Sequence, residues 1–350
     1  MHLWGREYTR ETLLQRVGRL EQVGGVEATV LDDGPGRGTR ALRFSGAGGL
    51  ACTVLPDRCM DIAHMSWHGH PLSWINNAGV AAPGLAMHDE QGFGRTFLGG
   101  MVTTCGLTNS GPGGHDDGER IYMHGLATYA PAGAMAWGHR WDGERCILFA
   151  RGTIRQARLF GENLTLTREI TMDLDGTSLT IADVVRNEGW ETSPHMIMYH
   201  CNVGFPLLDE GARLIGRFAS VVPRDEEAAR GLERFALVDG PRAGFKEQVF
   251  ITTPLANEEG CHEVTLWNPA LAGGVGLRLD WDAASLPWMF AWRQLGQGAY
   301  VLGLEPSNCP VITGRAEARA NGTLPFLAPQ EERRYHLRFT VVSAPPEGAV

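Results

Sequence analysis

Residues 164–172 read Leu-Thr-Leu-Thr-Arg-Glu-Ile-Thr-Met, and this stretch decides the fold class. Leu164, Leu166, Ile170 and Met172 stand at every second or fourth position, with threonines and a glutamate between them. Successive side chains of a strand point to opposite faces, so one face of this run is apolar and the other is polar. The pattern predicts a β-strand with one buried face and one wetter face.

Two later stretches repeat this alternation, at residues 277–281 and 335–341. Glycine (46 residues) and proline (19 residues) interrupt the chain often, which is typical of many short antiparallel strands joined by turns. Residues 225–235 read as a brief helix, but the regular alternation of strand and helix that builds a parallel sheet is missing. The sequence therefore predicts an all-β protein, a large antiparallel β-sandwich.

A short amphipathic helix is expected near the N-terminus. Apolar residues recur at helical spacing from Leu13 to Leu20, and Gly24 with Gly25 is expected to end the helix. The chain shows no internal repeat and no linker. We therefore expect residues 1–24 to form an N-terminal helical extension and residues 25–343 to form a single β-sandwich domain.

The charge and cysteine content exclude several classes of protein. The net charge is −9, with 31 Lys and Arg against 40 Asp and Glu, and no basic run occurs. Nucleic acids and anionic membranes are bound through clustered cations, so neither is an expected partner. No stretch approaches the ~20 apolar residues that span a bilayer. Seven scattered cysteines without a Cys-x-x-Cys pair predict neither a disulfide framework nor a zinc site, and favour a reducing cytoplasm.

Four segments carry polar residues where a plain strand would not need them. In the first, Arg58 stands in the mostly apolar stretch 54–62. A buried arginine is costly unless it is paired, so Arg58 is expected either to form a structural salt bridge or to reach the hydroxyls of a ligand. In the second, His124 stands among apolar residues. It is expected either to be a hydrogen-bonded residue of the core or of a turn, or to have a functional role.

The other two segments hold the strongest candidates for chemistry. A strand at residues 196–206 places His200 and Asn202 on the same face. Glu305 ends an apolar strand and precedes Pro306. Burial raises the pKa of a carboxyl group toward the range of a general base, although a glutamate that caps a loop is the alternative.

Several weaker features are also visible. His68 and His70 flank a glycine, which suits a hairpin turn better than a metal clip. Residues 110–119 form the most flexible-looking interior loop, and its segment His115-Asp116-Asp117 is expected to be solvated. Four tryptophans could stack on a sugar ring, although most are expected in the core: Trp74, Trp267, Trp288 and Trp292.

In this order and with this spacing, the four segments resemble the aldose 1-epimerase superfamily, also called galactose mutarotase-like. The matching positions are Arg58, His124-Gly125, His200 and Glu305-Pro306, within residues 25–342. The details look closer to an aldose epimerase-like branch that is a domain of unknown function. Its motifs are similar to residues 55–62, 69–74, 199–206 and 303–307.

The resemblance implies a large antiparallel β-sandwich and a mutarotase reaction, in which a sugar ring opens and closes again to exchange the anomers. It implies that Glu305 takes the proton of the C1 hydroxyl and that His200 protonates the ring oxygen. Arg58, His124, Asn202 and Glu247 would then bind the other hydroxyls. The reaction needs no cofactor and no metal, and the expected partner is a small free sugar.

The chain also departs from the pattern of the galactose enzymes. Cys59 replaces the glycine that follows the arginine, and Cys201-Asn202 replaces the usual residues after the histidine. Glu247 is the nearest match to a sugar-binding aspartate. These departures leave the particular sugar open.

The sequence leaves two alternatives open. One is another isomerase, epimerase or lyase reaction in the same site, assisted by a metal if His64 joins His124, His200 and Glu305. The other is a carbohydrate-binding protein without catalysis, since the same architecture serves both purposes. An exposed face of the sandwich could also support a homodimer.

Overall fold

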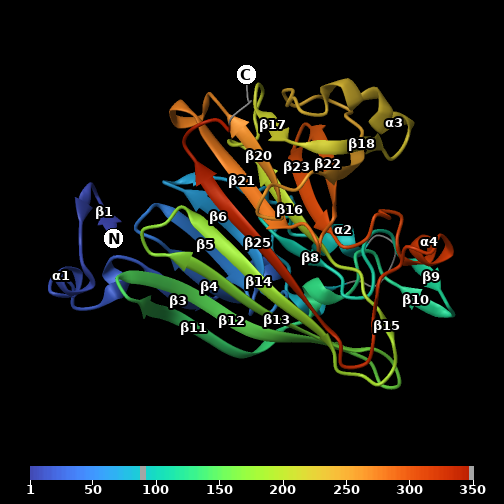
Figure 1. The fold of residues 1–350 in the computed structure, drawn as a ribbon, viewed down its shortest axis with the longest axis horizontal. Helices are drawn as coiled ribbons and strands as arrows, with labels where there is room; N and C mark the ends of the chain where they lie inside the picture. The colour runs from blue at the N-terminus through green and yellow to red at the C-terminus, as the bar shows by residue number, and fades with distance from the viewer. Residues whose placement is uncertain (87–91, 347–350) are drawn as a thin grey trace.

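The stretch at residues 164–172 lies within strand β13 (Asn163–Asp173), in the middle of an antiparallel sheet of eight strands (Figure 1). The computed structural model describes residues 1–86 and 92–346. The strands of this sheet, in spatial order, are β11 (Ala132–Asp142), β12 (Arg145–Ala157), β13, β14 (Ser178–Asn187), β25 (Glu332–Val342), β21 (Val275–Asp282), β20 (Cys261–Asn268) and β17 (Arg213–Gly216).

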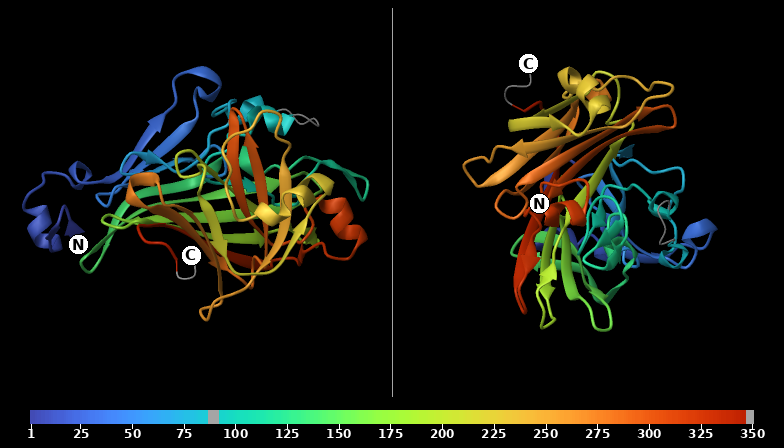
Figure 2. Two further views of the ribbon diagram at one scale, coloured as in Figure 1. Left: turned by 90° about the horizontal axis from the view of Figure 1, so that it is seen from above. Right: turned by 90° about the vertical axis from the view of Figure 1, so that its right-hand side faces the viewer.

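Two further sheets pack with it. The six-stranded sheet has the order β18 (Phe218–Pro223), β19 (Gln248–Pro254), β22 (Trp288–Gly296), β23 (Ala299–Ser307), β16 (Met198–Gly204) and β8 (Thr103–Cys105). The five-stranded sheet is β3 (Gly25–Val30), β4 (Arg40–Ser45), β5 (Leu50–Leu55), β6 (Asp61–Trp67) and β7 (His70–Pro71). In Figure 1 the eight-stranded sheet runs across the front, with β4–β6 behind it and β22 and β23 to its right. Figure 2 shows the same layers from above and from one side.

Short elements complete the fold. The two-stranded pairs are β1 (His2–Leu3) with β2 (Arg6–Glu7), β9 (Gly114–Asp116) with β10 (Glu119–Ile121), and β15 (Ser193–Pro194) with β24 (Phe326–Leu327). The α-helices of the described residues are α1 (Arg10–Leu14), α2 (Gly92–Thr96), α3 (Glu226–Arg230) and α4 (Arg315–Ala320). One hydrophobic core contains buried residues of all three large sheets, including Phe44, Leu166 and Val203. The predicted antiparallel β-sandwich is confirmed.

The N-terminal helix is shorter than the sequence pattern predicted. Helix α1 begins after the N-cap Thr9 and ends at Leu14, and a separate 3-10 turn covers Leu20–Gln22. Leu13 and Leu20 are both buried, so they share the core without sharing a helix. Gly25 opens β3 rather than capping a helix. The domain boundaries at residues 24 and 343 stay a prediction.

The loop at residues 110–119 also differs from expectation. It contains β9 and the start of β10, and Asp116 is buried rather than solvated. The Asp116 carboxylate accepts hydrogen bonds from Arg315 and Arg319 of α4 at 2.6 and 2.7 Å. The expected turn between His68 and His70 is confirmed, since His68 and Gly69 form the turn that joins β6 to β7.

The cysteines form no disulfide. All seven are free thiols, and Cys261 is the one that is not buried. Among the described residues, no helix is long and apolar enough to cross a membrane.

A buried ion pair lies where the three sheets meet. The Nη2 atom of Arg168, on β13, lies 2.6 Å from Asp183 Oδ2 on β14, and both side chains are fully buried. The hydroxyl of Tyr199, on β16, donates to the same Asp183 oxygen at 2.7 Å. The six-stranded sheet is therefore attached to the eight-stranded sheet through the carboxylate of Asp183.

The same guanidinium reaches the third sheet. Its Nη1 donates to Thr104 Oγ1 on β8 at 2.9 Å and lies 3.5 Å from Asp61 Oδ1 on β6. The backbone N–H and the hydroxyl of Thr104 both donate to Asp61, and so does the hydroxyl of Thr128. Every oxygen of both buried carboxylates therefore has a donor, which is the condition under which buried charge is tolerated.

We expect Asp183→Asn to lower the free energy of unfolding by about 3–5 kcal/mol, because it leaves the buried charge of Arg168 without its main partner. The midpoint of urea denaturation measures the change. The matched control is Asp173→Asn, which removes a partly exposed partner of Arg145 at the end of the neighbouring strand β13 and should cost about 0–1 kcal/mol. Equal losses in the two variants would contradict the role assigned to the buried pair.

Candidate active site

His200 and Glu305 lie opposite each other on neighbouring strands. On β16 and β23, Met198 pairs with Ser307 and Cys201 pairs with Leu304, so the register between them sets His200 beside Glu305. All residues of β16 are buried, and their side chains alternate between the two faces of the sheet. Tyr199 points to Asp183, whereas His200 points away from it, into a pocket.

A glycine leaves room for the carboxylate. A Cβ atom at Gly303, on the same face of β23, would lie 2.7 Å from Glu305 Oε1 and 3.2 Å from the Trp292 side chain. Any larger residue at this position would displace one of them. The absence of a side chain at Gly303 therefore helps to define the shape of the site.

The imidazole and the carboxyl group are in direct contact. His200 Nε2 lies 3.2 Å from Glu305 Oε1, although the two groups are not aligned as a hydrogen bond. His200 Nδ1 and Glu305 Oε1 are buried, and neither has a hydrogen-bond partner among the described residues. Buried polar atoms are normally satisfied, so unsatisfied atoms at a pocket indicate a place where a ligand binds.

Burial shifts the two groups in opposite directions. It raises the pKa of Glu305 to about 8, and the negative charge of Glu247 adds to the effect. It lowers the pKa of His200 to about 3, and the neighbouring His124 contributes. A low-dielectric site favours the neutral form of each group. Both shifts therefore favour a neutral carboxyl group beside a neutral imidazole.

His124 supplies a second imidazole to the pocket. Its ring centroid is 5.8 Å from that of His200. The backbone N–H of Gly111 donates to His124 Nδ1 at 3.2 Å, so the ring proton of the neutral form is on Nε2. Burial lowers the pKa of His124 to about 4, which keeps the ring neutral. His124 can therefore donate one hydrogen bond to a ligand.

Apolar rings surround the two imidazoles. Phe97 and Trp292 lie 5.0 and 5.4 Å from His200 between ring centroids, and Phe93 lies 4.6 Å from His124. Aromatic faces of this kind stack on the C–H groups of a sugar ring and hold water away from the reacting atoms.

A charged cluster closes one side of the pocket. Arg224 Nη2 lies 2.8 Å from Asp225 and 3.1 Å from Glu247. The indole N–H of Trp292 donates to the other oxygen of Glu247 at 2.9 Å. The pocket has a volume of about 330 Å³. Its lining residues are Phe93, Phe97, Gly111, Pro112, Met123, His124, His200, Arg224, Glu247, Val249, Trp292, Glu305, Ile312 and Thr313.

Of the six residues predicted for the site, four line the pocket: His124, His200, Glu247 and Glu305. Arg58 does not. Its guanidinium is fully buried and donates to the backbone oxygens of Thr128, Ala81 and Thr96. The interpretation of Arg58 as a sugar-binding residue is therefore not supported, and its role is to hold loops together. The neighbouring Cys59 has φ of 55°, a conformation that favours the glycine found there in the family pattern.

Asn202 shares the face of His200, as predicted, but it also lies outside the pocket. Its amide nitrogen donates to the backbone oxygens of Gly99, Gly100 and His200 at 2.9–3.1 Å. The side chain therefore fixes the segment that leads into β8. The structure gives Asn202 a positioning role instead of direct contact with a ligand in this pocket.

No sequence pattern pointed to three other residues that line the pocket: Arg224, Phe93 and Phe97. Arg224 follows Pro223 and precedes the N-cap Asp225 of α3, a boundary between strand and helix that could have been noted. Phe93 belongs to α2, whose five residues carry no periodic signal, and Phe97 directly follows the helix. Of the four tryptophans considered, only Trp292 lines the pocket.

A metal site was one of the alternatives. Within residues 1–86 and 92–346, no three His, Cys, Asp or Glu side chains converge in a way that could hold a metal ion. His64, the extra ligand considered, lies on β6 and does not line the pocket.

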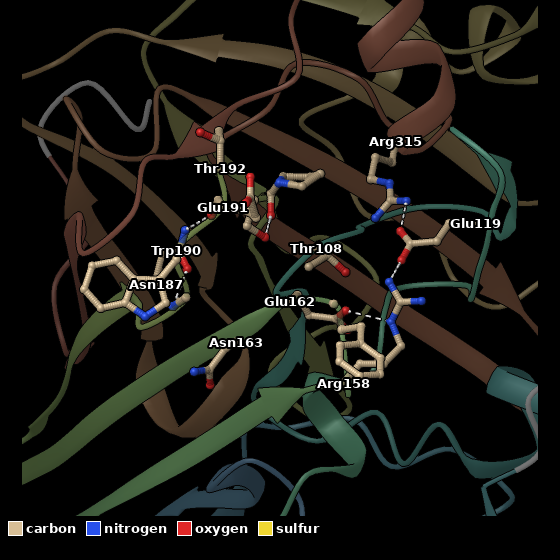
Figure 3. Close-up of a pocket in the computed structure, with 15 residues that line it drawn as sticks. Thr108, Glu119, Arg158, Glu162, Asn163, Asn187, Trp190, Glu191, Thr192 and Arg315 are labelled. Atoms are coloured by element: carbon tan, nitrogen blue, oxygen red, sulfur yellow. Dashed lines mark hydrogen bonds and ion pairs between the residues drawn. The ribbon is translucent and has the colours of Figure 1, made fainter.

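Figure 3 shows a different hollow of about 400 Å³, between the β12–β13 turn and the segment around Trp190. Four of the five charged groups that line it are already paired with one another. Arg158 contacts Glu119 and Glu162, and Arg315 donates to Glu119 at 2.7 Å. No buried unsatisfied polar atom of the described residues lines it. The pocket of His200 and Glu305 is therefore the stronger candidate for chemistry.

Comparison with solved structures agrees with the fold. A candidate aldose 1-epimerase from Klebsiella pneumoniae superposes with a TM-score of 0.86 at 25% identity, over 92% of this chain and 86% of that one. A galactose mutarotase-like protein from Clostridium acetobutylicum (TM-score 0.63, 10% identity) and a galactose 1-epimerase from Lactobacillus acidophilus (TM-score 0.59, 12% identity) each cover 91% of this chain, and this chain covers 98% of each.

Comparison of sequences gives the family. No curated protein matches this sequence. The profile of a family described as a domain of unknown function, DUF4432, matches residues 36–341, which is most of the chain. The protein therefore belongs to the DUF4432 family, and its fold is that of the galactose mutarotase-like proteins.

Proposed function

We propose that this protein is an aldose 1-epimerase that interconverts the anomers of a free sugar. The observation that carries the proposal is the buried contact of His200 with Glu305, at 3.2 Å, in a pocket lined by aromatic rings. Ring opening needs a base at the C1 hydroxyl and an acid at the ring oxygen. Both oxygens are bonded to C1, so the two groups that serve them must lie side by side, as His200 and Glu305 do.

The proton balance of the reaction fits a pair that holds one proton. In ring opening, one group takes the proton of the C1 hydroxyl while the other gives its proton to the ring oxygen. The bond between C1 and the ring oxygen breaks, and an aldehyde forms. After rotation about the C1–C2 bond, ring closure on the other face reverses both transfers. No net proton enters or leaves, and the original state of the pair returns.

The environment favours a starting arrangement opposite to the one implied by the family resemblance. Burial raises the pKa of Glu305 and lowers that of His200. Glu305 therefore begins as the acid at the ring oxygen, and neutral His200 begins as the base at the C1 hydroxyl. Ring closure then proceeds with the roles exchanged. His124 and Glu247 would bind other hydroxyls of the sugar.

The charges at the pocket favour a neutral sugar. Arg224 is the one cationic side chain among the described residues that line the pocket, and it is bound to Asp225 and Glu247. An added carboxylate on the ligand would meet one cation shared by two carboxylates. Like charges close together repel, so an anionic sugar is disfavoured.

We expect Glu305→Gln and His200→Asn each to slow catalysed anomeric exchange by about 10²–10⁴-fold, because each removes one proton-transfer group. NMR exchange measurements across hexoses, pentoses and deoxy sugars give the rates. The matched control is Glu247→Gln, the same carboxylate-to-amide change at the pocket mouth, which should raise KM more than it lowers kcat. Sugar binding without any acceleration by the wild type would instead support a carbohydrate-binding protein.

The pH profile tests where the shared proton resides. The charged form of Glu305 appears as pH rises through about 8, so kcat/KM, after subtraction of the uncatalysed rate, should fall above about pH 8. Because the pKa of His200 is lowered to about 3, the rate should stay level across the weakly acidic range. A rate that rises between pH 4 and 6 would show a carboxylate of ordinary pKa acting as the base, contrary to this mechanism.

Substrate charge can be tested separately. Galacturonate and galactose differ at C6, so their exchange rates with the same enzyme compare an anionic and a neutral sugar. We expect the neutral sugar to have the higher kcat/KM. Arg224 is central to this expectation, and a preference for the uronate that disappears in Arg224→Met would contradict it.

A further inference from the structure

A second pocket lies on the reverse face of the sheet that carries the candidate site. Glu247 and Trp292 line the candidate site, whereas the next residues along the chain, Gln248 and Arg293, line the second pocket. Gln248 and Arg293 pair across β19 and β22. We call this hollow of about 420 Å³ the reverse-face pocket; it is lined by Glu227, Arg230, Gly231, Arg234, Asp239, Arg242, Ala243, Gly244, Phe245, Lys246, Gln248 and Arg293.

The reverse-face pocket is strongly basic in an acidic protein. Its described lining has five basic side chains against two carboxylates, an excess of three positive charges, although the whole chain has a net charge of −9. The carboxylates are each bound by one arginine, Glu227 by Arg230 and Asp239 by Arg234. Three cations remain without an ion-pair partner among the described residues: Arg242, Lys246 and Arg293.

Arg293 is the basic residue of this pocket whose side chain is held in a fixed position. Its side chain is only 3% exposed. Its two terminal nitrogens donate to the backbone oxygens of Arg234 and Leu237 at 2.8 and 2.9 Å. These partners are neutral, and the nearby carboxylate whose charge acts on the guanidinium, that of Asp239, is already bound by Arg234. A buried cation is costly in this state, and an anion in the pocket would relieve the cost.

The remaining groups suit a phosphate with a small organic body. Arginine presents a planar set of N–H groups that matches phosphate oxygens, and lysine adds a compact charge. Arg242 also lies over the ring of Phe245 at 5.1 Å, which gives the pocket an apolar wall beside its cations. A cavity of this size falls in the range that holds small metabolites.

We propose that the reverse-face pocket binds a phosphomonoester, with the phosphate held by Arg293, Arg242 and Lys246. The site is distinct from the pocket of His200 and Glu305, and the proposal does not depend on the anomeric reaction. Glycerol 3-phosphate is a suitable probe because it has no anomeric carbon. Its binding therefore tests this site, whatever the outcome for the proposed epimerase activity.

Isothermal titration calorimetry of the full chain with glycerol 3-phosphate, inorganic phosphate and glycerol tests the proposal. We expect saturable binding of the first two and none of glycerol. Arg242→Ala with Lys246→Ala should weaken the binding of glycerol 3-phosphate by about tenfold or more, because two charge-assisted contacts are lost. Both side chains are exposed, so this double variant is expected to fold.

The control variant also removes two positive charges, but at positions outside the reverse-face pocket. Arg43 and Arg151 are exposed and outside the reverse-face pocket, so Arg43→Ala with Arg151→Ala should leave the affinity within about twofold. Equal weakening in the two double variants would show a response to net charge alone. Absence of saturable binding to the wild type, or equal affinity for chloride and phosphate, would also overturn the proposal.

Discussion

The buried guanidinium of Arg168 is the interaction on which this structure depends. It contacts Asp183 within the eight-stranded sheet, Thr104 in the six-stranded sheet and Asp61 in the five-stranded sheet. Apolar packing alone tolerates small shifts between layers, because hydrophobic attraction has no direction. A buried charge with directed hydrogen bonds does not tolerate them. The network therefore fixes how the three sheets lie relative to one another.

The positions of the side chains in the candidate active site depend on that network. Tyr199 donates to Asp183 on one face of β16, and the next residue, His200, faces the pocket on the other. Glu305 is held on the neighbouring strand by the sheet register. The two candidate proton-transfer groups therefore sit on strands rather than on loops, and their separation is set by hydrogen bonding of the backbone. The loops contribute other residues that line the pocket, such as Arg224 and Glu247.

Much of the fold and part of the site could be predicted from the sequence. The alternation around Leu164 is local, so it predicted a strand correctly, and the family resemblance singled out His200 and Glu305. Long-range effects were not predictable in this way. Asp116 looked solvated because its partners in α4 lie about two hundred residues away along the chain. Arg58 was expected at the ligand because nothing in the sequence shows the carbonyl oxygens that enclose it.

The two faces of the β19–β22 pair carry two different pockets. Successive residues of each strand point to opposite faces, so neighbours along the chain line different pockets. Segments that border one pocket continue into the other, as where Arg224 leads into α3 and Lys246 into Glu247. Occupancy of the two pockets is then subject to thermodynamic linkage. If an anion on one face changes the affinity for a ligand on the other by some factor, that ligand must change the affinity for the anion by the same factor. Through this one strand pair, the affinity of each pocket for its ligand would depend on whether the other pocket is occupied.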